Sequence, residues 1–308
     1  MTKIAVVGSL NMDLVIRTPR LPAPGETILG REFTTAPGGK GANQAIAAAK
    51  LGASVAMVGR VGSDGFGRTL REGLSADAVD ITHVFTDDYA ATGVAVIQVD
   101  DQGQNTIVVA SGANAQVTRA DVDKSRAVLT SANALVVQLE IPLDTVTYAL
   151  QLAREAHVLT ILNPAPAQRL DSDMLALADI LVPNETEAGF LTGTAASDWA
   201  TGEAAARELH RRGARTVVIT LGARGALVFE NNMAHQVPPF QVRAVDATAA
   251  GDAFVAALAV ARASGRDMDT ALREASAAGA LTATKLGAQP SLPTRKDLDE
   301  FLKLRNRE

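Results

Sequence analysis

Residues 245–252 read Val-Asp-Ala-Thr-Ala-Ala-Gly-Asp, and an apolar, alanine-rich run follows at 253–263. The run predicts a helix, because its larger apolar residues recur at helical spacing. The small residues before it let a ligand approach the main chain, and free amides at a helix start favour an anion such as a phosphoryl group. Asp252 stands at that start, where its carboxylate could cap the helix or accept a proton from a substrate hydroxyl.

Composition narrows the class of protein. The 308-residue chain is 47% hydrophobic and 20% charged, which is enough to bury a large core. Its net charge of −5, without a long basic run, argues against nucleic acid or an anionic membrane as a partner. The absence of cysteine excludes disulfides, thiolate metal sites and a cysteine nucleophile. The apolar start at 4–8 is too short for a signal peptide and no segment could span a membrane, so we expect a cytoplasmic protein.

Strand and helix patterns alternate along most of the chain, which predicts a mainly parallel sheet with helices on both faces in one domain, 1–308. Ligands of such sheets lie beyond the carboxyl ends of the strands. The expected strands are 4–8, 55–61, 135–138, 158–163, 180–182, 216–221 and 226–230; the expected helices are 41–51, 66–74, 143–156, 203–212, 251–264, 270–284 and 297–304.

Two stretches break the alternation. Residues 13–33 hold three prolines without a helical period, and residues 92–110 contain two strand patterns, 94–99 and 106–110, around a turn signal. Strands without a helix between them do not belong to a simple βαβ layer. The two stretches therefore form either a small β-sheet lid over the carboxyl edge or two ordinary surface excursions.

Two groups of polar residues could bind a sugar. The segment 37–44, Pro-Gly-Gly-Lys-Gly-Ala-Asn-Gln, opens a helix and lets the backbone approach a ligand, with donors from Lys40 and Asn43. It lacks the spacing of a Walker A loop, and the alternative is a turn with Lys40 in solvent. Asn11 and Asp13 follow the first strand, where they could bind adjacent hydroxyls or simply form a turn.

Further polar groups stand where strands end. Glu140 is a turn carboxylate. Asn184 and Glu187 are spaced for a water-mediated contact with phosphate-bound Mg²⁺ and equally for a capping box. Residues 220–225, Thr-Leu-Gly-Ala-Arg-Gly, offer amides and a hydroxyl to a nucleotide, or form a β-turn. Because an α/β sheet gathers strand ends at one edge, these groups favour a single site.

The order of these motifs, with Asn-Pro-Ala-Pro-Ala at 163–167, resembles the sugar and nucleoside kinases related to the minor phosphofructokinase. Segments 38–44, 163–167 and 285–291 are most similar to the ribokinase branch. The resemblance covers residues 3 to 304. It implies a ribokinase-like α/β fold with a small β-sheet lid, here about 13–33 and 92–110, that also forms a homodimer contact. The implied reaction is ATP-dependent phosphorylation of D-ribose at the 5-hydroxyl, which gives D-ribose 5-phosphate and ADP.

The resemblance also implies a role for each matching position. Asp252 would be the catalytic base, and Ala249, Ala250 and Gly251 would form the anion hole. Ribose would contact Asn11, Met12, Asp13, Gly39, Lys40, Asn43, Glu140 and Asp252. The nucleotide would contact Asn184, Thr220, Gly222, Ala223, Arg224, Gly225, Gly251 and Ser276. Glu187 would hold Mg²⁺ indirectly, and an activating K⁺ would be bound by Asp246, Thr248, Thr282, Lys285, Gly287 and Ser291.

Three positions vary from the family pattern, and one of them is Thr248, which stands where isoleucine also occurs. Ala247 stands where threonine is common, and Ser276 stands where histidine or asparagine often flanks adenine. Alternative functions are a kinase for deoxyribose, fructose or a nucleoside, and a non-catalytic sugar or nucleotide sensor. Asn11 beside a 2-hydroxyl would disfavour deoxyribose, and the intact Gly251–Asp252 pair argues against a sensor. An NAD-dependent oxidoreductase is improbable, because the dinucleotide fingerprint is missing.

Overall fold

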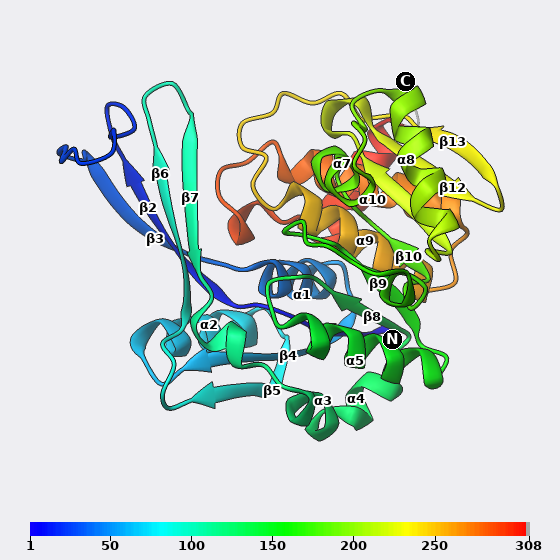
Figure 1. Ribbon diagram of the computed structural model, residues 1–308, viewed down its shortest axis with the longest axis horizontal. Helices are drawn as coiled ribbons and strands as arrows, with labels where there is room; N and C mark the ends of the chain where they lie inside the picture. The colour runs from blue at the N-terminus through cyan, green and yellow to red at the C-terminus, as the bar shows by residue number, and fades with distance from the viewer. Residues whose placement is uncertain (306–308) are drawn as a thin grey trace.

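The computed structural model describes residues 1–305 and contains a nine-stranded sheet and a four-stranded sheet (Figure 1). The strand order of the large sheet is β13-β12-β11-β10-β9-β8-β1-β4-β5. Its strands run parallel from β5 to β11, whereas β12 and β13 are antiparallel to their neighbours. The bounds are β1 (Lys3–Val7), β4 (Ser54–Gly62), β5 (Asp80–Asp87), β8 (Ala134–Val137), β9 (Leu159–Leu162), β10 (Ile180–Leu181), β11 (Thr216–Thr220), β12 (Ala226–Glu230) and β13 (Met233–Val237).

Helices pack on both faces of the large sheet. On the interior strand β1, Ile4 and Val6 join the core beneath α1, α9 and α10, whereas Ala5 and Val7 join the core beneath α5 and α8. The helices are α1 (Lys40–Lys50), α2 (Gly65–Ala76), α3 (Arg119–Lys124), α4 (Arg126–Thr130), α5 (Leu143–Glu155), α6 (Ser172–Leu175), α7 (Glu185–Thr192), α8 (Trp199–Arg211), α9 (Ala250–Ala263), α10 (Met268–Thr282) and α11 (Arg295–Arg305), with 3₁₀ turns η1 (Gly112–Gln116), η2 (Gly222–Arg224) and η3 (Gln289–Ser291).

Every strand and helix predicted for the large sheet is present, with ends that differ by a few residues. The edge strands β5 and β13 and the short helices α3, α4 and α6 were not predicted, because short or half-exposed elements carry little periodic signal. Within residues 1–305 no helix combines the length and the apolar character needed to cross a membrane.

The four-stranded sheet consists of β2 (Asn11–Arg17), β3 (Glu32–Gly38), β6 (Gly93–Val99) and β7 (Asn105–Ala110), in the order β3-β2-β6-β7. It projects from the body of the molecule beside α1 and α2 (Figure 1). Strand β2 is antiparallel to β3 and parallel to β6. The two sequence stretches that break the alternation therefore form one small sheet, and the alternative of separate surface excursions is wrong.

A buried ion pair ties β4 to α3. The guanidinium of Arg60 donates to both carboxylate oxygens of Asp121 at 2.9 and 3.0 Å, and to Asp87 at 2.9 Å. Asp121 is fully buried and also completes a capping box with Thr118. Burial alone would raise the pKa of Asp121, but hydrogen bonds from Arg60 and Thr118 hold it below its usual value.

We expect Asp121→Ala to lower the free energy of unfolding by about 3 kcal/mol or more, because it leaves a half-buried guanidinium short of a partner and removes a cap. Urea unfolding measures the loss. Asp123→Ala, which removes an exposed ion pair with Arg126 on the next turn, should change stability by less than about 0.5 kcal/mol. Equal effects of the two substitutions would contradict this account.

Candidate active site

The starts of α1 and α9 meet at the carboxyl edge of the large sheet. Both helices carry alanine on their packed faces, so their axes approach closely. Gly39 precedes α1 with φ of 90°, and a Cβ there would lie 2.7 Å from the Asn11 amide nitrogen. Ala249 precedes α9 in the left-handed region with φ of 61°, an unusual conformation for a residue with a side chain. These two turns bring together segments that lie about two hundred residues apart in sequence.

Asp252 lies in the first turn of α9 without capping the helix. The cap position is Ala249, and no side chain makes a capping hydrogen bond there. Instead, the Asp252 carboxylate accepts hydrogen bonds from Asn43 Nδ2 at 3.0 Å and from Gln44 Nε2 at 2.9 Å. Burial raises the pKa of Asp252, while Lys40 and the two amides oppose that rise. The cap hypothesis is therefore wrong, and the carboxylate is available for chemistry.

Backbone amides lie beside this carboxylate. The Ala250 amide donates to the Ala247 carbonyl at 3.1 Å, so it is already engaged. In the part of the chain that the structure describes, no carbonyl or side chain accepts a hydrogen bond from the amides of Gly251 or Asp252. The Ala250 amide is therefore already paired, whereas the amides of Gly251 and Asp252 can receive an anion; the assignment of the anion hole to Ala249, Ala250 and Gly251 stays a prediction.

Four acidic residues surround one lysine at this edge. Burial raises the pKa of Asp13 to about 7, and the charges of Glu140 and Asp252 contribute to the rise. Burial would lower the pKa of Lys40, but Asp252, Glu140 and Glu187 hold it above its usual value. The Lys40 ammonium therefore belongs to the site, and the alternative of a lysine in open solvent is wrong.

Asn11 and Asp13 lie on β2 rather than in a turn. Because side chains alternate along a strand, they share one face, while Met12 faces the hydrophobic core. The buried Asn114, on η1, orients Asn11: its Oδ1 accepts from the Leu10 amide at 2.9 Å, so its Nδ2 donates to Asn11 Oδ1 at 2.7 Å. Asn11 therefore presents its NH₂ group to a ligand.

Glu140 follows β8 and is hydrogen-bonded to the start of α1. Its carboxylate accepts hydrogen bonds from the Ser9 hydroxyl and from the Lys40 amide. Sequence reasoning missed Ser9 and Asn114, and also Gln44, Gln138 and Asn163 as side chains of the site. Gln44 and Asn163 stood within quoted motifs, but a motif alone does not say which side chains turn toward the carboxylate.

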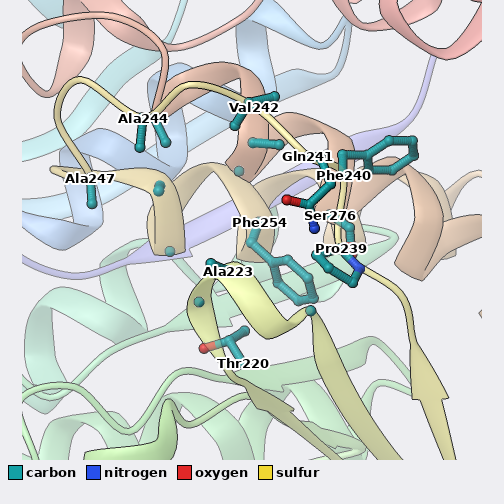
Figure 2. Close-up of a pocket in the computed structure, with 17 residues that line it drawn as sticks. Thr220, Ala223, Pro239, Phe240, Gln241, Val242, Ala244, Ala247, Phe254 and Ser276 are labelled. Carbon is teal, nitrogen blue, oxygen red and sulfur yellow. The ribbon is translucent and has the colours of Figure 1, made fainter. Parts of the chain in front are cut away.

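A cavity of about 410 Å³ opens between α9, α10 and the turn after β11 (Figure 2). Six of the eight residues expected to contact a nucleotide line it: Thr220, Gly222, Ala223, Gly225, Gly251 and Ser276. The apolar wall includes Pro239, Phe240, Val242 and Phe254, of which the loop residues carried no sequence signal. The Ser276 hydroxyl is buried and has no hydrogen-bond partner among residues 1–305.

Arg224 and Asn184 do not line this cavity. The Arg224 guanidinium turns away to Glu185 and to the Ser197 carbonyl. Asn184 caps α7, where its side chain accepts from the Glu187 amide at 2.8 Å and the Glu187 carboxylate accepts from the Asn184 amide at 2.8 Å. The structure therefore confirms the capping box. Asn184 also pairs with Thr220 in an isolated β-bridge, so it lies beside one wall of the cavity.

Two of the segments expected to bind K⁺, 245–248 and 283–287, are hydrogen-bonded to each other. The Asp246 carboxylate accepts from the Thr248 amide and the Gly287 amide, both at 2.9 Å. Burial would raise the pKa of Asp246, but the hydrogen bonds from Thr248 and Gly287 lower it. Thr282 and Ser291 are buried, and their hydroxyls donate to the carbonyls of Ala278 and Ala288. A carboxylate and loop carbonyls are suitable donors for K⁺.

Within the described residues, no group of three or more histidine, aspartate or glutamate side chains could hold a metal ion by itself. A Mg²⁺ ion at this site would therefore need phosphate oxygens and water among its ligands, as nucleotide-bound Mg²⁺ commonly has. The Glu187 carboxylate fits such an indirect contact, since it is within electrostatic range of Lys40 and Asp252.

Comparisons with known proteins identify the family of this chain. The model of the pfkB family of carbohydrate kinases matches residues 1–295. A ribokinase from Haemophilus influenzae is 44% identical over 299 residues, covering 97% of this chain and 98% of the relative. A Salmonella typhi deoxyribokinase is 37% identical, covering 98% of this chain and 99% of the relative. The structure of Arabidopsis thaliana ribokinase complexed with ribose and ATP has a TM-score of 0.93 and 34% identity, covering 98% of this chain and 99% of that one. The chain belongs to the pfkB family of carbohydrate kinases.

Proposed function

We propose that this protein is a ribokinase, which transfers the γ-phosphoryl group of ATP to the 5-hydroxyl of D-ribose and releases D-ribose 5-phosphate and ADP. One observation carries the proposal: the buried Asp252 carboxylate lies beside the unengaged amides of Gly251 and Asp252, and Gly251 also lines the nucleotide-sized cavity. The ribokinases among the relatives support ribose as the acceptor. Deoxyribose, fructose and nucleosides remain the alternative acceptors.

The reaction follows from this arrangement. The nucleotide would occupy the cavity with its γ-phosphoryl group at the amides of Gly251 and Asp252. As the 5-hydroxyl oxygen attacks phosphorus in line, its proton passes to the Asp252 carboxylate and the bond to ADP breaks. Lys40 and the helix amides would stabilise the negative charge that develops on the transferred group. Bound Mg²⁺, held indirectly by Glu187, would neutralise phosphate charge.

The sugar would lie among the polar side chains at the base of the second sheet. Asn11 offers an NH₂ group, Lys40 offers an ammonium, and Asp13 offers a carboxylate that can accept hydrogen bonds from two hydroxyls. Asn43 and Glu140 complete the set that the family resemblance implies. Binding energy from these contacts would hold the 5-hydroxyl against Asp252, which is the positioning that phosphoryl transfer requires.

The second sheet would act as the lid and as the contact between two copies of the chain in a cytoplasmic homodimer. All residues of β7 are exposed, including Ile107, Val108 and Val109, and Phe33 on β3 is 61% exposed. An exposed strand with apolar side chains is unusual for a monomer and suits a protein interface. The proposed lid comprises about 13–33 and 92–110 within a single domain, 1–308.

Asp252→Asn should lower kcat by about 10²- to 10⁴-fold, because an amide cannot accept the hydroxyl proton. A coupled ADP-release assay with ribose measures kcat, and calorimetry should show that ribose affinity changes much less. Asp144→Asn, at the exposed start of α5, is the matched control and should keep full turnover. Retention of most turnover by Asp252→Asn would remove Asp252 as the base.

Asp13→Asn should stabilise the free protein and weaken sugar binding. Asp13 has a pKa of about 7 when folded and about 3.8 when unfolded, so its ionisation opposes folding increasingly as pH rises from 4 to 7. We expect a gain on the order of 1 kcal/mol at pH 8, discounted for partial exposure, and almost none at pH 4. Urea unfolding at both pH values, with and without ribose, measures this. An equal gain at both pH values would rule out the ionised Asp13 as its cause.

Turnover should be higher in potassium than in sodium chloride at equal ionic strength. The oxygen donors around Asp246 suit the larger ion, and its binding would fix the loop that precedes α9. Asp246→Asn should reduce the difference between the two salts, while ribose affinity stays close to that of the wild type. Equal rates of the wild-type protein in both salts would contradict the cation assignment.

A further inference from the structure

Gln44 is a buried side chain of α1 that directly contacts the proposed base. It is 1% exposed, and its Nε2 donates to Asp252 Oδ1 at 2.9 Å and to Asn163 Oδ1 at 3.1 Å. Its Oε1 accepts from Gln138 Nε2 at 2.6 Å. The carboxamides of Gln138 and Asn163 therefore both bond to Gln44, which in turn donates to the carboxylate of Asp252.

The orientation of these carboxamides is determined by a backbone carbonyl. The Val182 carbonyl can only accept a hydrogen bond, and it accepts from Asn163 Nδ2 at 2.9 Å. Asn163 must therefore turn its Oδ1 toward Gln44, which obliges Gln44 to turn its Nε2 toward both Asn163 and Asp252. The Val182 carbonyl, directly after β10, therefore determines that Gln44 turns its NH₂ group toward Asp252. The carboxylate itself does not determine this orientation.

The two donors to Asp252 differ in what else they contact. Asn43 holds Oδ2 and is also expected to contact the sugar, and Gln289 supports it through a long hydrogen bond of 3.3 Å. Gln44 holds Oδ1, and both the Nε2 and the Oε1 of its carboxamide are bonded to protein partners. Oδ1 is thus the anchored oxygen, and Oδ2 is the oxygen beside the sugar contacts.

This group of three carboxamides lowers the stability of the folded protein. Gln138 is fully buried, and its Oε1 has no hydrogen-bond partner in the described part of the chain. Apolar side chains of similar size would fill the same space without an unsatisfied oxygen. A buried polar arrangement with an unmet partner is more readily explained by a role at the site than by a contribution to folding.

We propose that Gln44 is the positioning residue of the base: it holds Asp252 Oδ1 so that the carboxylate stays ionised, in one rotamer, with Oδ2 turned toward the acceptor hydroxyl. The proposal rests on the proposed function, in which Asp252 accepts the proton. Gln44 itself undergoes no chemical change. The proton of the hydroxyl moves to Oδ2, the alkoxide oxygen bonds to phosphorus, and the bond to the leaving ADP breaks.

Gln44→Met keeps the length of the side chain and removes its donor. We expect kcat to fall about 10- to 100-fold, with the KM for the sugar within about threefold of wild type, because the lost interaction acts on the base. Loss of a hydrogen bond to the ionised form raises the pKa of Asp252. The acidic limb of the kcat profile should therefore move to higher pH by about one unit. Gln44→Glu should move it further, since two carboxyl groups would share one proton.

Thr160→Val is the matched control. Thr160 is fully buried on β9 and its hydroxyl donates to the Leu177 carbonyl at 2.7 Å, so the substitution also removes a buried hydrogen bond. It should lower stability and leave the acidic limb where it is in the wild type. The proposal is overturned if Gln44→Met keeps wild-type kcat and the same limb, or if Thr160→Val moves the limb equally.

A second variant keeps the test decisive if Gln44→Met does not fold. Asn163→Leu removes the acceptor that orients Gln44 and should move the acidic limb upward in the same direction, by less. An unmoved limb in that variant would overturn the proposal. All variants are assayed with whichever sugar the wild-type protein phosphorylates fastest. Failure of the wild type to use ribose would refute the proposed substrate, while the comparison of limbs would still test Gln44.

Discussion

The site depends on the pair of hydrogen bonds that α1 donates to Asp252 on α9. Asn43 and Gln44 lie 209 and 208 residues from Asp252 in the chain, so these two bonds join the N-terminal and C-terminal halves of the fold. They require the two helix starts to come within side-chain reach. The alanine-rich faces of α1 and α9 permit that approach, and the turns at Gly39 and Ala249 set the angle of each start.

The same constraint explains the electrostatics around the base. A buried carboxylate is unfavourable unless donors and a cation compensate for lost water. Asp252 receives two amide donors and lies in the field of Lys40, which in turn faces Glu140, Glu187 and Asp13. After the unusual backbone at Ala249, the amides of Gly251 and Asp252 have no hydrogen-bond acceptor among the described residues. The strained backbone at Ala249 lowers stability locally, and the same turn leaves amides that can bind a negative charge.

Much of the fold followed from the sequence, because buried parallel strands and amphipathic helices carry strong periodicity. The location of the site also followed, since polar residues stood at successive strand ends. What could not be predicted depends on side-chain direction. Asn184 and Glu187 bond to each other, Arg224 turns to Glu185, and Asn114 orients Asn11 from a loop without a motif. Spacing places residues at an edge, whereas packing decides where their polar atoms point.

The most direct measurement is a crystal structure of the protein with ribose and a non-hydrolysable ATP analogue, grown in a potassium salt. Our account predicts the 5-hydroxyl oxygen within about 3.2 Å of an Asp252 carboxylate oxygen, with the terminal phosphate on the amides of Gly251 and Asp252. The account would be contradicted if both ligands were bound but the hydroxyl lay out of hydrogen-bond reach of Asp252, and the terminal phosphate away from α9.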